Sequence, residues 1–161
     1  MSINCRLLIF VIGLILSVPA IARAENICPS LPVIAGVEWN YKEGPDFYIC
    51  YAVKGTKQLF GLYLGNFPNF HPDQNATGRK GRIGGFDVVW YSGKSDDAAK
   101  PIKIQTILKI SSRPEPTVDG PPPPPGGPEF AHIWINAANE LDMVDVLKLV
   151  QDLKFKTTAS P

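Results

Sequence analysis

Apolar and polar residues alternate along most of the chain after residue 36, a pattern typical of β-strands that have one dry and one solvated face. Each alternating run is closed by Gly, Pro, Asp or Ser, which are turn residues. Because very short turns join the first three runs, we expect them to form an antiparallel meander. The pattern predicts five or six strands, over residues 37–42, 47–54, 58–65, 86–91, 101–110 and 130–136. A glycine within the third run, Gly61, indicates a bulge or a close backbone approach.

After the last predicted strand, the spacing of apolar residues changes from every second residue to the spacing of an α-helix. The helix is expected to begin near Asn139, a residue type that caps helix N-termini, with Asp142 in the first turn. Its apolar stripe comprises Met143, Val146, Leu147, Val150 and Leu153. We therefore predict an α+β fold, in which an antiparallel sheet of five or six strands carries one C-terminal helix packed on one face.

Residues 1–24 have the layout of a secretory signal peptide, with a weakly basic start, an apolar run over 7–22 and small residues at positions 22 and 24. Cleavage is predicted between Ala24 and Glu25. The apolar run has 16 residues and would span about 24 Å as a helix, less than the roughly 30 Å hydrocarbon core, which disfavours the alternative of an uncleaved anchor. The mature protein is predicted to be a single exported domain, 25–161, either secreted or periplasmic and without a stable membrane anchor.

Cysteine usage is consistent with export. Cys5 lies in the predicted signal peptide, so the mature chain keeps an even number of cysteines, Cys28 and Cys50. A disulfide between them would close a loop of about 23 residues and stabilise the fold by roughly 3 kcal/mol. The alternative is a reactive thiol pair, which needs a short spacing and an activating basic or helix-terminal setting. Neither feature is present, so the sequence favours a structural disulfide.

Charge and low-complexity content narrow the classes of function. Without Arg6 and Arg23 the mature chain has 14 basic and 15 acidic side chains, a balance that argues against nucleic-acid binding through bulk charge. Eight of the 16 prolines fall between Pro114 and Pro128. We interpret residues 111–129 as one long surface loop, because the 30 or so residues that follow are too few to fold as a separate domain.

Sequence signatures of catalysis are missing. The chain has no nucleophile elbow, phosphate-binding loop, dinucleotide fingerprint or Cys-x-x-Cys pair. These absences favour a non-catalytic protein without a cofactor. The alternative is a metal-binding protein or a metal-dependent hydrolase, in which His71, Asp73 and His132 supply a two-histidine, one-carboxylate site for zinc or a similar ion. A small apolar ligand held between sheet and helix is a third hypothesis.

The predicted loop over residues 66–82 carries the most suggestive side chains. It combines two aromatic residues and three basic residues in an otherwise polar stretch, namely Phe67, Phe70, Arg79, Lys80 and Arg82. Such a set suits contact with a partner protein, a glycan or an anionic surface, although the two phenylalanines could instead pin the loop to the sheet. The loop also contains a glycosylation sequon at Asn75. The leading hypothesis is an exported, non-catalytic domain that binds an extracytoplasmic partner through this loop; the sequence defines neither the partner nor the oligomeric state.

Overall fold

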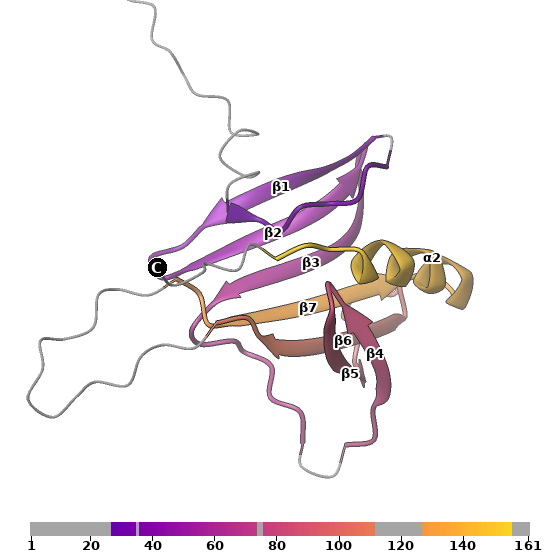
Figure 1. Ribbon diagram of the computed structural model, residues 1–161. Coiled ribbons are helices and arrows are strands. Elements are labelled where there is room, and N and C mark those ends of the chain that lie inside the picture. The colour runs from indigo at the N-terminus through magenta and orange to yellow at the C-terminus, as the bar shows by residue number, and fades with distance from the viewer. Residues whose placement is uncertain (1–26, 35, 74–75, 112–126, 156–161) are drawn as a thin grey trace, which may run out of the picture.

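The computed structural model describes residues 27–34, 36–73, 76–111 and 127–155. The predicted signal peptide with its cleavage site, Asn75 and most of the proline-rich segment lie outside these residues. Seven strands and one helix are described, namely β1 (Val37–Glu43), β2 (Phe47–Lys54), β3 (Lys57–Gly65), β4 (Arg79–Ile83), β5 (Phe86–Gly93), β6 (Ile102–Lys109), β7 (Phe130–Ala137) and α2 (Glu140–Gln151). They form the α+β antiparallel architecture that the sequence predicts (Figure 1).

The strands form one sheet in the order β1-β2-β3-β7-β6-β5-β4, and every neighbouring pair is antiparallel. The first three strands form the predicted meander. The fourth strand in the order of the sheet is β7, so the last strand of the chain occupies the middle of the sheet. As a result, the chain between β3 and β4 has to pass from the centre of the sheet to its far edge.

The number of strands differs from the prediction. The structure has seven strands instead of five or six, because Arg79–Ile83 pairs with β5 and is not part of the loop. Its Arg-Lys-Gly-Arg sequence has no apolar alternation, so periodicity did not identify it. The missed signal is Gly84-Gly85, whose φ angles of 55° and 92° are the positive values that a tight two-residue hairpin requires.

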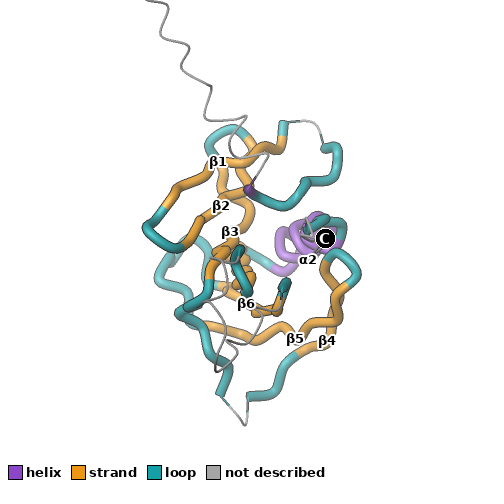
Figure 2. Tube along the Cα trace, turned by 60° about the vertical axis from the view of Figure 1, so that its left-hand side comes forward, coloured by secondary structure: helices purple, strands orange, loops and turns teal. Residues whose placement is uncertain are grey.

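The two faces of the sheet differ in burial. On β7, four alternate residues are buried and the residues between them are only partly buried. The buried side chains form one core with residues of α2, including Leu149 and Val150. Figure 2 shows the sheet curving around the helix, which lies on its concave side. The opposite, convex side has no helix over it among the described elements, and we call it the open face.

The N-terminal segment is fastened to this core at several points. The predicted disulfide between Cys28 and Cys50 is confirmed, with a Cα–Cα distance of 6.1 Å. The indole Nε1 of Trp39 donates to the carbonyl oxygen of Pro29 at 2.7 Å. Ser30 and Lys154 exchange two backbone hydrogen bonds, which join the segment to the chain after the helix. The disulfide is consistent with an oxidising compartment.

The helix begins as the sequence predicts. Oδ1 of Asn139 accepts from the backbone N–H of Asp142 at 3.0 Å, so Asn139 is confirmed as the N-cap. At the other end, the backbone N–H of Gly84 donates to the carbonyl oxygen of Gln151 at 3.0 Å, so the β4–β5 turn contacts the helix C-terminus. Within the described residues, no helix combines the length and the apolar character needed to span a bilayer.

Candidate binding face

A line of directly opposed residues crosses the open face from β2 to β5. Its members are neighbours in the strand register, in the order Tyr51, Gly61, Trp134, Gln105 and Tyr91. We call this line the aromatic row. Four strand spacings separate its ends, about 19 Å at roughly 4.8 Å per spacing. The row therefore places three aromatic rings across the strands, on the face that α2 does not cover.

The rings of the row are in contact with one another. Tyr51 and Trp134 meet nearly at right angles, with centroids 6.2 Å apart. The indole of Trp134 lies over Gly61 so closely that a β-carbon at Gly61 would overlap it. The close approach predicted at Gly61 is thus made by an indole rather than by backbone. The irregularity in the pairing of β2 with β3 lies elsewhere, between Ala52 and Val53. Because Gly61 has no side chain, the indole can pack directly against the backbone of the sheet.

The segment between β3 and β4 crosses the open face beside this row, and Phe70 fastens it there. The Phe70 ring stacks on His132 at a centroid distance of 5.2 Å and an interplanar angle of 21°. It also contacts Tyr91 at 6.0 Å. Phe70 therefore pins the segment to the sheet, which is the alternative that the sequence left open for both phenylalanines.

Phe67 behaves differently from Phe70. Its side chain is 75% exposed, and its backbone N–H donates to the Tyr63 hydroxyl oxygen at 3.2 Å. The backbone is thereby held while the ring extends into solvent. Of the two aromatic residues singled out in the sequence, only Phe67 is available for contact with another molecule.

His132 lies beneath Phe70 and is electrically neutral near pH 7. Burial, and secondly the positive charge of Lys103, lower the pKa of His132 from 6.5 to about 4. Its Nε2 is 3.3 Å from Oε1 of Gln105, and an amide oxygen can only accept, so the imidazole donates through Nε2. The imidazole is thus held between a ring contact and a hydrogen bond to the aromatic row.

A groove extends the aromatic row toward the edge of the sheet. It has a volume of about 560 Å³, and its lining includes Tyr91, Val89 and Ile107 from the sheet, Pro72 from the crossing segment and Lys80 from β4. The groove therefore has mostly apolar walls, with the ammonium group of Lys80 and the carboxylate of Asp87 at its lining. Tyr91 belongs both to the row and to the groove, so the two form a continuous surface.

The three predicted basic residues lie on β4 rather than on a loop, and all three are exposed. Arg82 is engaged locally, since Nε lies 3.4 Å from Oδ1 of Asp87 and Nη2 donates to the carbonyl oxygen of Gly85 at 3.3 Å. Arg79 and Lys80 take part in none of the ion pairs found among the described residues. A strand holds these two cations more firmly than the predicted loop would.

The hypothetical metal ligands are not assembled into a centre. His71 and Asp73 are exposed on the crossing segment, while His132 is stacked under Phe70. Within the described part of the chain, no three His, Cys, Asp or Glu side chains are grouped closely enough to hold a metal ion. The geometry gives this alternative no support.

The aromatic row is not apparent from the sequence alone. Alternation assigned Tyr51 and Trp134 to strands, but the row exists only because β7 inserts between β3 and β6. A signal was present in Gly61, since a glycine within a strand often marks a site where another group approaches closely. No family model, curated protein or solved structure matches this chain.

Proposed function

We propose that this protein is an exported, non-catalytic domain that binds an extracytoplasmic partner through the segment over residues 66–82 and the open face beneath it. The observation that carries this proposal is the contrast between Phe70 and Phe67. One ring anchors the segment to the sheet, and the other is 75% exposed a few residues away. An exposed aromatic side chain on an anchored backbone costs little entropy to bury on binding, which is typical of residues that dominate interfaces.

Lys80 supports the same surface, since it is exposed on β4 and lines the groove next to the segment. Arg79 is exposed at the same edge of the sheet but lies opposite the core residue Trp90, and so faces the helix side. Charges at the rim of an interface accelerate association and select partners of opposite sign. The proposed contact region therefore has an apolar centre at Phe67 and a cationic side at β4.

Export is part of the proposal. It is supported by the signal-peptide layout of residues 1–24 and by the disulfide, which persists in the secreted or periplasmic space rather than in a reducing cytosol. The mature form would be residues 25–161. The proposal includes no catalytic step.

The test compares two exposed apolar residues from different parts of the surface. Leu141, on the exposed side of α2, is 80% exposed and serves as the matched control for Phe67. The mature protein and its Phe67→Ser and Leu141→Ser variants are immobilised and exposed to the exported fraction of the source cells, and bound components are quantified by mass spectrometry. We expect Phe67→Ser to lose a component that Leu141→Ser retains. Equal recovery on all three proteins would contradict the proposed surface.

A further inference from the structure

Basic side chains outnumber acidic ones on the strands of the open face. Among the described strand residues on that face, the charged side chains are Lys42, Lys80, Lys103, Lys109, Glu38 and the ion pair of Arg82 with Asp87. Four ammonium groups are thus offset by one carboxylate. Lys42 lies over the Tyr51 ring at 5.9 Å, and Lys103 is close enough to His132 to lower its pKa. Lys42 and Lys103 therefore lie beside the aromatic row.

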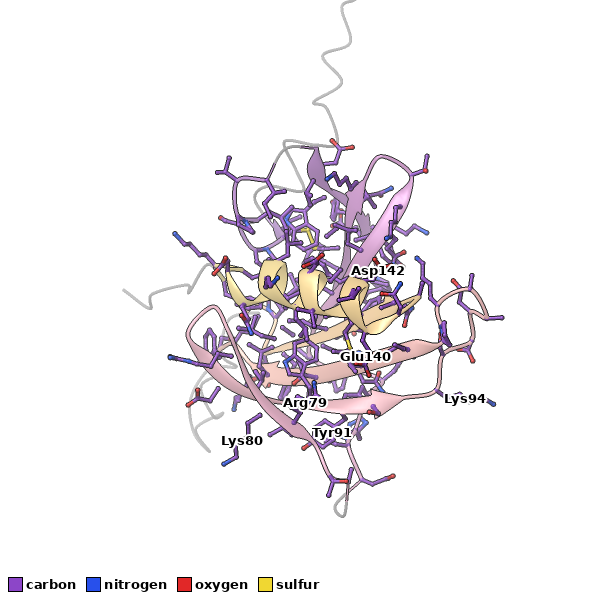
Figure 3. The ribbon with its side chains drawn as sticks, turned by 90° about the vertical axis from the view of Figure 1, so that its right-hand side faces the viewer. Arg79, Lys80, Tyr91, Lys94, Glu140 and Asp142 are labelled. Atoms are coloured by element: carbon purple, nitrogen blue, oxygen red, sulfur yellow. A yellow bond between two sulfur atoms is a disulfide. The ribbon has the colours of Figure 1, made fainter. Side chains whose placement is uncertain are left out.

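The side that carries the helix has no such excess of cations. Exposed or partly exposed carboxylates on α2 and its C-cap come from Glu140, Asp142, Asp145 and Asp152. Lys148 is the one basic residue of the helix and is paired with Asp145 at 3.1 Å. Figure 3 shows Glu140 and Asp142 on the helix, with Lys80 and Tyr91 on the far side of β4 and β5. Lys57 pairs with Asp142 at 3.3 Å on this same side, and Arg79, opposite the buried Trp90 in the register, also faces it. The helix side thus carries charges of both signs, whereas the strands of the open face have an excess of cations, which selects an anionic ligand.

The shape of the row indicates what kind of anion fits. Tyr51, Trp134 and Tyr91 are spaced along a line across the strands, and the groove continues that line past Tyr91. A compact anion would contact one end of this surface only, whereas an extended polymer would contact all of it. Partly exposed rings in a line need ligand units that have flat apolar faces.

We propose that the open face binds an acidic polysaccharide, a chain of sugar rings that carry carboxylate groups, with successive rings lying along the aromatic row. This inference rests on the proposed function and names its partner class. The C–H groups on the face of a sugar ring contact the electron-rich face of Tyr51 or Trp134. Uronic carboxylates pair with Lys42 and Lys103 on either side of the row, and the amide of Gln105 hydrogen-bonds to hydroxyl groups. Phe70 contacts Tyr91 at one end of the row and stacks on His132 beside it.

The probe for this inference is polygalacturonate, with two polymers as matched controls. Fully methyl-esterified polygalacturonate keeps the sugar rings and lacks the charge, and poly-glutamate keeps the charge and lacks the rings. Binding is measured by titration calorimetry on the mature, disulfide-bonded protein. We expect polygalacturonate to bind at least about tenfold more tightly than either control, because each control lacks one of the two kinds of contact. Added salt should weaken its binding by screening the charges.

Substitutions locate the site. Trp134→Leu should reduce the affinity for polygalacturonate at least about tenfold. Lys103→Gln, at a partly exposed position, should reduce it severalfold without affecting folding, and Lys148→Gln on the helix should leave it unchanged. Affinity that survives both open-face substitutions, equal affinity for poly-glutamate or for the ester, or no binding of polygalacturonate overturns the inference. If polygalacturonate does not bind while capture by the immobilised protein still depends on Phe67, the inference fails and the proposed function stands. Loss of both refutes both.

Discussion

The Phe70 ring stacks on the imidazole of His132 at 5.2 Å and 21°, which fixes the β3–β4 crossing segment against the centre of the sheet. Because of this contact, Phe70 holds the segment against the sheet, whereas the Phe67 side chain remains exposed to solvent. We expect Phe70→Ala to destabilise the protein by about 1–2 kcal/mol, less than a fully buried Phe because the ring is only partly buried. Phe67→Ala should change stability by no more than about 0.5 kcal/mol. Urea unfolding of both variants measures the difference, and equal destabilisation would contradict the assignment.

The protonation of His132 makes stability depend on pH. Its pKa is about 4 in the folded protein and close to 6.5 in the unfolded chain, so the unfolded chain binds more protons between these values. The stabilising contribution is therefore complete above pH 6.5 and is lost as the pH falls toward 4. We expect a loss of about 1–2 kcal/mol over that window, since solvent near the partly exposed ring reduces the effect. His132→Gln should unfold with a smaller pH dependence between pH 4 and 6.5 than the unmodified protein.

The two causes of the lowered pKa of His132 can be separated by a substitution. Burial is the larger cause and the Lys103 charge the smaller. In Lys103→Gln, the pKa of His132 should rise toward 6.5 but recover less than half of the difference. Nuclear magnetic resonance titration of the imidazole protons gives the value directly. Full recovery to 6.5 would mean that the charge, not burial, keeps the imidazole neutral.

Gly61 is expected to be intolerant of any side chain. A β-carbon there would overlap the Trp134 indole, whereas one at Gly93 would meet only the flexible ends of Gln105 and Lys103. Gly61→Ala should cost about 1–3 kcal/mol, because the indole must leave its place in the aromatic row. Gly93→Ala, also in a strand of the sheet, is the matched control and should cost less than about 1 kcal/mol. Thermal unfolding of both variants, followed by tryptophan fluorescence, tests this contrast.

The disulfide should account for a large part of the stability. Its half-cystines are 22 positions apart, and the chain-entropy model assigns a loop of that size roughly 3 kcal/mol. The Cys28→Ser, Cys50→Ser double variant should lose about that amount in urea unfolding. Reduction of the unmodified protein should have the same effect. A stable, unchanged protein after reduction would show that the N-terminal segment is held by its other contacts, such as the Trp39–Pro29 hydrogen bond.

The strands, the start of the helix and the disulfide could be predicted from the sequence. Alternation predicted the strands, the asparagine at 139 predicted the helix start, and two remaining cysteines predicted the disulfide. Each of these depends on residues close in the chain or on simple counting. The fourth strand from the N-terminus escaped notice, because its polar residues are held by pairing with β5 rather than by burial of an apolar face.

The candidate binding face could not be predicted from the sequence in the same way. Trp134, Gln105 and Tyr51 come together through pairings between strands far apart in the sequence. Period-two alternation assigns a residue to a face but does not say which strand lies beside it. For the same reason, the sequence could not tell Phe70 from Phe67, since only the position of His132 in the middle of the sheet distinguishes them.

The central claim is that the surface around residue 67 contacts a partner outside the cytoplasm. The most direct measurement places a photo-crosslinking amino acid at position 67 in the cell of origin, with position 141 on the helix as the equally exposed control. We predict a discrete crosslinked product from position 67 that position 141 does not give. Identical products from both positions, or none from position 67, would contradict the claim.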